Sequence, residues 1–523
     1  MITFRPLSSL AQYLVDSLEH KETSVHEERR ITVNPIVTKF ASWYERLRNA
    51  MEFREDEVIL RATIERILKR RLLLGGNGKT TAKPLVKELL WARYLPENDI
   101  GESVVKQIEE AIDLYLSLRL RILSKHKFPE SVINEWTYDL MSSDIQYLLN
   151  PKRSKELIAN FMYHVLKDDV AVEEESPETK NAQVFIAVRK AFARDDLAFL
   201  RYHLFCQYFG RLTPKTLDYT VEHFIKGYRE ILHQMNYVGR ERVYTYVKRR
   251  TAAFFIFEDI LENQRGNLKS LLENEETLRE VVYEACEKRY KSISMRVRTA
   301  IIRSVIFILF TKVAFAFFVE GTYEKFVYGH IIWESIIINT SIPPLLMIIV
   351  SLFIRTPGQD NSERIFAYIT RLLYEEDPVL GNKLVISKQN TEKGFVTAFN
   401  ILWLFAFCLS FGAIIYVLTQ MHFNIISQTI FIFFLAIVSF LSYRIALIAN
   451  VYRVGEKQGF GTFLVDFLFM PVIRVGRSLT QGISKINIFL MLFDFFIEAP
   501  FKYLFAFFDQ WFHFLHAKTE ELE

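Results

Sequence analysis

The hydrophobic pattern of this chain divides it into two unlike halves. In the first 300 residues, apolar positions recur at helical spacing among many charged ones, whereas the second half contains four long apolar stretches. A helix of about 20 apolar residues is long enough to cross the hydrocarbon core of a bilayer. The pattern therefore predicts four transmembrane helices, the alternative for each being a buried helix of a soluble core. The stretches are Ile301–Val319, Ile331–Ile354, Phe395–Leu418 and Ile425–Tyr443.

Two of the four stretches contain charged or helix-breaking residues. The third and fourth contain no charge, which buried helices of soluble proteins rarely achieve at this length. The first contains Arg303 and Lys312, and the second contains Glu334 and the pair Pro343-Pro344. Charge in hydrocarbon is costly and often functional. Lys312 and Glu334 would differ in depth by about four residues, or roughly 6 Å, so the sequence predicts an intramembrane ion pair between them.

The proline pair predicts a kink in the second stretch, because Pro343 and Pro344 remove two backbone donors from the helix. Asn339, Thr340 and Ser341 lie just before the prolines. Polar groups beside freed carbonyls resemble the broken helices of transporters. Two interpretations stay open: the kinked hairpin lines a conduction path, or it contains a structural ion pair and nothing more.

Lys and Arg residues near the ends of the stretches predict the orientation in the membrane, because cytoplasmic loops carry an excess of them. Fifteen lie on one side, whereas the two short loops on the other side contain only Lys325. We therefore expect a multi-pass protein of a plasma or bacterial inner membrane with both termini in the cytoplasm. The fifteen are Lys288, Arg289, Lys291, Arg296, Arg298, Arg303, Arg355, Arg364, Arg371, Lys383, Lys388, Lys393, Arg444, Arg453 and Lys457.

The first 300 residues have the pattern of helices throughout. Asn34-Pro35 has the residue types of a helix start, and Gly75-Gly76 those of a helix end. No alternating run predicts a sheet. The expected class is therefore all-α: a helical cytoplasmic domain, a four-helix transmembrane region and C-terminal interfacial helices.

The segment from Asn267 to Val319 contains no Gly or Pro and predicts a stalk helix that enters the first membrane stretch. At 1.5 Å per residue it would be about 80 Å long; the alternative is a break near Ser292–Ser294. The predicted divisions are a helical subdomain (1–167), an acidic linker (168–180), a second subdomain with the stalk (181–300), a transmembrane hairpin (301–354), a cytoplasmic loop (355–394), a second hairpin (395–449) and a membrane-interface region (450–523).

The C-terminal region Gly459–Ala517 is expected to lie on the membrane surface without crossing it. Asp466, Pro471 and Arg474 interrupt its first apolar run, and Pro500 divides the two later ones. A thin polar stripe opposite many aromatic residues suits the headgroup boundary. The alternative is a fifth and a sixth span packed as a hairpin.

Composition and motifs add few candidates for chemistry. The net charge of +4 is too small to require a nucleic-acid partner, and the three separate cysteines favour a reducing compartment. Met1–His20 lacks an apolar run of signal-peptide length. Residues 75–81 (GGNGKTT) lack the first glycine of a phosphate-binding loop and follow a helix, which favours a helix cap with a solvated turn. With no metal-ligand spacing and no nucleophile motif, we expect no catalytic site, metal or cofactor.

Five segments toward the two ends of the chain have a familiar sequence. They are Ala41–Ala50 (ASWYERLRNA), Ile64–Arg71 (IERILKRR), Met470–Arg477 (MPVIRVGR), Ser484–Phe489 (SKINIF) and Asp494–Lys502 (DFFIEAPFK). Together they resemble an uncharacterised family of polytopic membrane proteins from small-genome candidate-phylum bacteria of the Patescibacteria type. The resemblance would cover most of the chain. It implies a bacterial inner membrane and assigns no activity and no functional residue.

These patterns favour a membrane-anchored scaffold or partner-binding protein without catalysis, which needs only an anchor and an exposed face. The second hypothesis is a transporter or channel around Lys312, Glu334 and the proline kink, although the last two stretches offer little polarity beyond Asn400 and Gln428. A membrane-associated enzyme is the third. The expected partners are the lipid bilayer and a protein that binds the cytoplasmic domain, with no nucleic acid. The patterns predict no oligomeric state.

The interfacial position of the C-terminal region predicts how reagents reach it. We consider single cysteines placed at Lys485, Pro500 and Lys518 in a background without the native cysteines. An impermeant maleimide added to intact cells should label none of the three. All three would face the cytoplasm or the inner membrane surface. Labelling at position 500 from outside would show instead that the region crosses the membrane as a hairpin.

Overall fold

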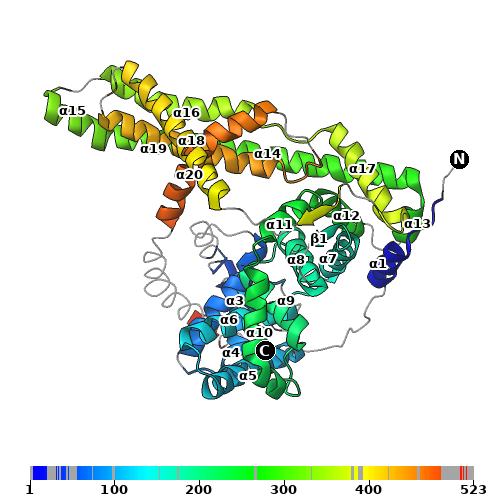
Figure 1. The fold of residues 1–523 in the computed structure, drawn as a ribbon. Helices are drawn as coiled ribbons and strands as arrows, with labels where there is room; N and C mark the ends of the chain where they lie inside the picture. The colour runs from blue at the N-terminus through cyan, green and yellow to red at the C-terminus, as the bar shows by residue number, and fades with distance from the viewer. Residues whose placement is uncertain are drawn as a thin grey trace, which may run out of the picture.

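The computed structural model is almost entirely α-helical, which confirms the helical class expected from the sequence (Figure 1). Two strands occur in the part of the chain that the structure describes, β1 (Val170–Val172) and β2 (Leu384–Ile386), and they pair in parallel. Three residues are too few to show an alternating pattern, so the sequence did not predict this small sheet. The structure describes residues 4–19, 31, 33, 37–39, 41–42, 45, 56–73, 75–96, 100–151, 153–172, 176–263, 268–330, 333–378, 382–386, 393–421, 423, 425–455, 460–484, 507–508, 510–511 and 514. The predicted helix start at Asn34-Pro35 lies outside these residues.

The helices fall into two groups along the chain. The first group is α1 (Ser9–Glu19), α3 (Asp56–Leu73), α4 (Gly78–Trp91), α5 (Glu102–Lys125), α6 (Glu130–Leu149), α7 (Arg153–Leu166), α8 (Pro177–Val188), the π-helical η1 (Arg189–Ala193), α9 (Leu197–Phe209), α10 (Leu217–Met235), α11 (Arg240–Lys248), α12 (Thr251–Asn263) and α13 (Leu268–Glu273). The second is α14 (Glu275–Phe315), the π-helical η2 (Ala316–Glu320), α15 (Gly321–Tyr328), α16 (Trp333–Leu352), α17 (Gln359–Tyr374), α18 (Lys393–Gln420), α19 (Ile425–Ala449) and α20 (Phe460–Ser484).

Two hydrophobic cores organise the soluble-looking half. The distal core is built mainly by α3–α6, α9 and α10 and buries Phe205 and Phe224 completely or nearly so. The proximal core is built by α1, α7, α8, η1, α11–α14 and α17, buries Phe254 and Phe257, and continues without a break into the apolar helices α16 and α19. Figure 1 shows the distal core at the bottom and the proximal core between it and the long helices at the top.

The predicted acidic linker at 168–180 is bordered by two helices of one core. Both α7 and α8 bury side chains in the proximal core, among them Met162 and Val188. Strand β1 occupies part of the linker and pairs with β2, which belongs to the predicted cytoplasmic loop. The segment therefore includes ordered structure, while the division into two subdomains stays a prediction.

Helix α14 corresponds to the predicted stalk, but it begins and ends at other residues than the sequence predicted. The side chain of Asn274 caps it by accepting hydrogen bonds from the backbone N–H groups of Glu276 and Thr277, so α13 is a separate helix. The helix passes Ser292–Ser294 without interruption, and the alternative of a break there is wrong. Through η2 and α15 the helical path continues to Gly329, whose φ of +75° ends it. The predicted outer loop from residue 320 onward is therefore largely helical.

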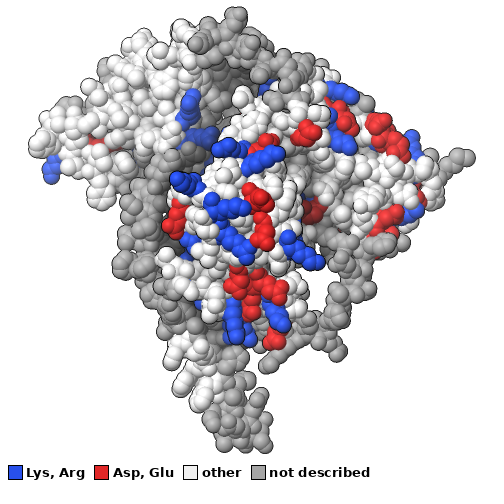
Figure 2. All heavy atoms as spheres, turned by 60° about the horizontal axis from the view of Figure 1, so that its bottom comes forward, with Lys and Arg blue, Asp and Glu red and all other residues white. Residues whose placement is uncertain are grey.

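Three helical segments in the described part of the chain are long and apolar enough to cross a membrane: Glu275–Val327, Thr397–Gln420 and Ile425–Ala449. The predicted second span corresponds to α16, whose apolar part, Ile336–Leu352, is shorter. Large apolar side chains cover the outer faces of this bundle, as Phe310 on α14 shows with 77% of its surface exposed. Figure 2 shows the bundle at the upper left with few charges, in contrast to the mixed charges over the soluble half.

Helix α20 packs across α18 and α19. A Cβ atom at Gly476 would lie 2.0 Å from the carbonyl oxygen of Ala436, so only glycine allows the two backbones to come this close. The guanidinium of Arg474 lies 5.4 Å from the ring centroid of Trp403 on α18. Most of the predicted membrane-interface region beyond residue 484 lies outside the described residues, including all three positions chosen for labelling. Its interfacial position stays a prediction.

The predicted cytoplasmic loop is anchored to the soluble half by α17. Leu372 and Leu373 of this helix are buried in the proximal core, and the Leu373 carbonyl accepts a hydrogen bond from the backbone N–H of Ser8 at 2.7 Å. At the other end of α17, the Asn361 side chain donates to the Tyr290 hydroxyl of α14 and to the Tyr452 carbonyl after α19, both at 2.7 Å. These two hydrogen bonds hold the start of α17 next to Tyr290 of the stalk and next to the segment that follows α19.

The two cores are joined by a buried arginine. Arg189 lies in η1, and its guanidinium donates to Asp195 at 2.6 Å, to both carboxylate oxygens of Glu156 at 2.5 and 3.0 Å, and to Nε2 of His203 at 2.6 Å. The next residue, Asp196, caps α9 and bonds Arg61 of α3 at 2.7 Å. The side chains of Arg189 and Asp195 are only 4% and 8% exposed, so their charges depend on each other.

Replacing Arg189 with Met should destabilise the protein strongly, because the buried charge of Asp195 would lose its partner. Removing one member of a buried ion pair costs about 3–5 kcal/mol. The measurement is the melting temperature of the detergent-extracted protein. Arg121→Met is the matched control: its partner Asp218 is 86% exposed, so the change should have little effect.

The same loss should be smaller at pH 5.5 than at pH 7.5. Burial raises the pKa of Asp195 from 3.8 to about 6, against the lowering effect of Arg189. The folded state therefore retains a proton that the unfolded chain has released, and the stability contributed by this group falls as pH rises from about 4 to 6. Without Arg189 the carboxyl would be neutral over more of this range. A loss of equal size at both pH values would show that Asp195 is not the group left unpaired.

Candidate functional site

The most unusual polar cluster lies inside the apolar bundle, around Lys312. The side chain of Lys312 is completely buried, and its Nζ donates to Oε1 of Glu320 at 2.6 Å. The ring centroid of Phe434 on α19 lies 5.2 Å from the same Nζ atom. Glu320 is 1% exposed. A cation and an anion are thus buried together among apolar helices. Removing either one would leave the other as an unpaired buried charge, which lowers the stability of the fold.

Glu320 reaches Lys312 because of the π-helix between them. Eight residues of a regular α-helix turn through about 800°, which would place position 320 some 80° away from Lys312 around the helix. A π-helical turn holds one extra residue, so position 320 falls where an i+7 residue would be, on nearly the same face. η2 ends at Glu320, and it therefore orients this carboxylate toward Lys312.

The sequence pattern missed Glu320 and named Glu334 instead. The apolar stretch ends at Val319, so the sequence predicts that Glu320 lies in a loop, and no sequence signal marks the π-helical turn. The side chain of Glu334 lies outside the described residues, and the predicted Lys312–Glu334 pair stays a prediction. The structure brings Lys312 together with Glu320 and with Asn339 of the predicted polar segment.

Asn339 joins the cluster from α16. Its Nδ2 donates to Oε1 of Glu320 at 2.9 Å, and its side chain is completely buried. Two oxygens of the cluster, Oε2 of Glu320 and Oδ1 of Asn339, have no hydrogen-bond partner among the described residues, and neither does Oγ1 of Thr340, the next residue along α16. Buried polar atoms nearly always have a partner, so the free oxygens of Glu320 and Asn339, two side chains joined by one hydrogen bond, call for an explanation.

The proline pair lies one turn beyond Asn339. α16 is one helix from Trp333 to Leu352, with Pro343 and Pro344 inside it. The helix thus continues past both prolines, and the predicted kink stays a prediction.

A cavity of about 520 Å³ adjoins the cluster between the two helices of the first hairpin. Ala316 and Phe317 of η2 line one wall, and Trp333, Ile336 and Thr340 of α16 line the other. Thr340 therefore belongs both to the cavity wall and to the group of free oxygens. Lys312, Glu320 and Asn339 are not among the residues that line it.

The cluster lies deep within the apolar belt. Exposed apolar side chains follow α14, η2 and α15 from Ile302 to Val327, and Lys312 is near the middle of this run. The predicted span ended at Val319, which placed Lys312 closer to the outer end. The longer helix moves this charge toward the centre of the bundle, where it is most costly.

The glycine-rich segment at 75–81 is a helix cap, as its sequence indicated. Gly75, with φ of +83°, follows α3, and Asn77 forms a capping box with Thr80 at the start of α4. The backbone N–H of Gly78 donates to Oδ1 of Asp113 at 2.7 Å. A carboxylate of the protein therefore already occupies the N-terminus of α4.

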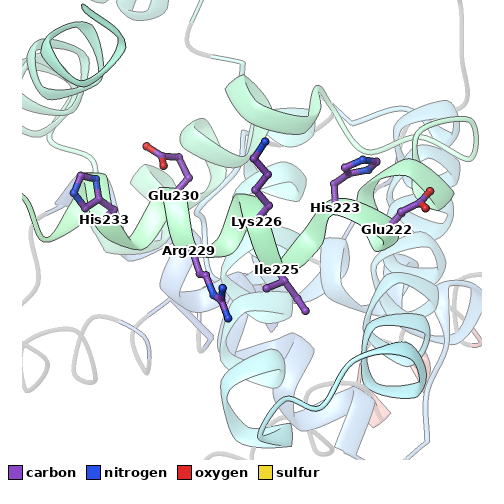
Figure 3. A pocket seen from close by; sticks show the side chains of 7 residues that line it. All are labelled: Glu222, His223, Ile225, Lys226, Arg229, Glu230 and His233. Carbon is purple, nitrogen blue, oxygen red and sulfur yellow. The ribbon is translucent and has the colours of Figure 1, made fainter. Parts of the chain in front are cut away.

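The other polar side chains considered in the soluble half do not point toward a common centre. Figure 3 shows a surface groove lined by one helix, α10, whose side chains fan outward and carry both charges, with His223 and His233 among them. No group of three or more His, Cys, Asp or Glu that could hold a metal occurs among the described residues. Burial raises the pKa of Cys206 to about 12, so its thiol is a poor nucleophile.

Comparison of the chain with protein-family models, with curated proteins and with solved structures finds no match. Function is therefore inferred from the geometry of the molecule alone.

A double-mutant cycle tests whether Glu320 is the partner of Lys312. Lys312→Met should lower the melting temperature markedly, because the Glu320 carboxylate would lose its buried counter-charge. Adding Glu320→Gln should restore part of this loss, since no charge then remains unpaired. The matched double variant is Lys312→Met with Glu334→Gln. Rescue by this second pair, and not by the first, would show that Glu334 is the partner, as the sequence predicted.

Proposed function

We propose that this is an integral membrane protein with four crossings and cytoplasmic termini, whose helical domain is a membrane-anchored scaffold for a protein partner. One observation carries the proposal. The loop between the second and third apolar helices shares the proximal core with the N-terminal half, through α17 and the β1–β2 pair. The contact is direct, because the backbone N–H of Leu384 donates to the Asp169 carbonyl and that of Ser8 to the Leu373 carbonyl, and segments bonded in this way lie on the same side of a membrane.

The paths of the helices support four crossings. α14 leaves the proximal core, and the loop after α16 is packed in that core again, so α16 is the return path. Its apolar part of 17 residues measures about 26 Å, a few ångströms below the usual hydrocarbon thickness, which local thinning of the bilayer accommodates. α18 and α19 form a second return, because the chain after α19 contacts Asn361 at the start of α17. The excess of Lys and Arg on this side favours the cytoplasm.

The surface of the soluble half supports a protein partner. Figure 2 shows basic and acidic side chains interspersed over the face that it presents, without a large area of one sign. Such a surface lacks the basic footprint of a nucleic-acid-binding domain, whereas alternating charge gives specificity between proteins. The exposed face of α10, with Glu222, Lys226, Arg229 and Glu230, is one such region.

Site-specific photo-crosslinking in native membranes tests the scaffold. A photoreactive residue at Lys226 or Glu230 of the full-length protein should yield a discrete protein adduct. The same residue at Phe405, 60% exposed on the apolar face of α18, is the matched control and should yield none. The absence of adducts from both α10 positions, together with solute uptake by reconstituted vesicles, would contradict the scaffold and favour transport.

Transport is the second candidate, because the Lys312–Glu320–Asn339 cluster is buried among the apolar helices. Two oxygens of this cluster, Oε2 of Glu320 and Oδ1 of Asn339, have no hydrogen-bond partner among the described residues, which is unusual for a purely structural ion pair. The two candidates differ in one measurement: a transporter moves a solute across reconstituted vesicles, and a scaffold does not.

The proposed topology predicts the result of reporter fusions. A reporter placed after His330, in the turn beyond Gly329, should be active only outside the cytoplasm, and one placed after Glu375, just after α17, only inside. The turn lies at the far end of the first hairpin, whereas Glu375 follows a helix of the proximal core. The same compartment for both reporters would mean that α16 does not cross.

A further inference from the structure

We propose that the cavity near the turn of the first hairpin binds an acyl chain of an anionic phospholipid, whose headgroup pairs with Lys325. The proposal goes beyond the scaffold function, which needs no bound lipid. It is carried by an apolar cavity whose lining side chains are exposed on the membrane face of the bundle, together with the basic side chain near its outer end. Phosphatidylglycerol is the representative lipid.

The cavity has the size and the depth of a site for one acyl chain. Its volume of about 520 Å³ falls within the range of about 300–1,000 Å³ that is typical of small-molecule sites. One wall follows α14, η2 and α15 from Val313 to Lys325, and the other follows α16 from Trp333 to Ser341. At 1.5 Å per residue these walls are about 18 and 12 Å long. Half of the hydrocarbon core of a bilayer measures about 15 Å, so the cavity has the depth of one leaflet.

The lining residues place the cavity on the side of the bundle that meets lipid. Phe317, Trp333 and Ile337 line it, and more than half of the surface of each is exposed. Exposed side chains of this kind within an apolar belt contact lipid, and tryptophan is typical of the boundary between the tails and the headgroups. In the proposed topology this end of the hairpin faces outward, so the lipid belongs to the outer leaflet.

Lys325 determines the charge of the headgroup. Among the described residues that line the cavity, Lys325 is the one that carries charge, and its exposed ammonium has no ion pair within the described part of the chain. Thr322 also lines the cavity and lies three residues earlier, on the same side of α15. An ammonium and a hydroxyl both donate hydrogen bonds, which suits the oxygens of a phosphate. A zwitterionic headgroup has an ammonium of its own that competes with Lys325, so a lipid of net negative charge gains more.

A bound lipid also gives the Thr340 hydroxyl an acceptor. Thr340 lines the cavity, and its buried Oγ1 has no hydrogen-bond partner among the described residues. It lies about 10 Å inward from Trp333 along α16. The ester carbonyls of a phospholipid lie inward from its phosphate and accept hydrogen bonds, so one of them would satisfy this hydroxyl while the phosphate stays near Lys325.

The first test is the thermal stability of the purified full-length protein in a neutral detergent, with phosphatidylglycerol or phosphatidylcholine of the same acyl chains added at equal mole fractions. A ligand that binds only the folded state raises the melting temperature, and phosphatidylglycerol should do so at the lower mole fraction. Lys325→Gln should weaken the apparent affinity for phosphatidylglycerol about fivefold, whereas Lys325→Arg should preserve it. Arg303→Gln, which removes an exposed basic side chain of α14 outside the cavity, is the matched control and should also preserve it.

The second test locates the lipid by contact quenching of tryptophan fluorescence in reconstituted vesicles. The part of the fluorescence that Trp333→Phe removes belongs to Trp333, and phosphatidylglycerol with brominated chains should quench this part more strongly than brominated phosphatidylcholine. Neither test depends on which side of the membrane is cytoplasmic, so this proposal and the proposed topology can fail separately.

Three results would overturn the proposal. Equal effects of the two lipids would show that the cavity does not select an anionic headgroup. A preference for phosphatidylglycerol that persists unchanged in Lys325→Gln would show that Lys325 does not hold the headgroup. A preference in the melting temperature without preferential quenching of Trp333 would place the lipid elsewhere on the protein.

Discussion

Both halves of the protein pack against α14, and this shared helix constrains the rest of the structure. Its first turns bury Leu278, Val282 and Cys286 in the proximal core, whereas its later turns bury Ile308 and Lys312 among the apolar helices. An α-helix satisfies its backbone hydrogen bonds internally, so it passes from water into hydrocarbon without a change of structure. Its 41 residues form a rod of about 60 Å, and a shift at one end is transmitted to the other.

The contacts of α17 make this rod part of a closed unit. Asn361 donates to the Tyr290 hydroxyl and the Tyr452 carbonyl, and its Oδ1 accepts from the backbone N–H of Val454 at 2.8 Å. All the polar atoms of this side chain have partners, as expected of a structural asparagine. Asn339 differs, since its buried carbonyl oxygen has no partner among the described residues. The two buried asparagines therefore differ in how completely their polar atoms are paired within the described part of the chain.

Charge is buried at two distant places, with different consequences. The guanidinium of Arg189 is hydrogen-bonded to Asp195, Glu156 and His203. These bonds fix the two helical cores relative to each other. Lys312 has one carboxylate partner among the described residues and an aromatic ring beside it. In both places a π-helical turn lies at the buried charge, η1 at Arg189 and η2 between Lys312 and Glu320. The extra residue of such a turn aims a side chain where a regular helix would not.

The sequence by itself determined the features that depend on local physics. Helical periodicity, apolar length and the residue types of caps predicted the helical class, the long apolar helices, the stalk and the cap at residues 75–81, because each follows from residues within a few turns of one another. It identified Lys312 and Asn339 as polar residues in an apolar environment for the same reason.

Only the tertiary structure decided which of these polar residues meet. Glu320 became a partner of Lys312 through an extra residue in one helical turn, which leaves no mark in composition or periodicity. The packing of α17 into the proximal core, the pairing of β1 with β2 and the contacts of Asn361 link residues that are 71 to 365 positions apart. Such pairings depend on how separate elements pack against each other, and the pattern within any one element does not encode its neighbour.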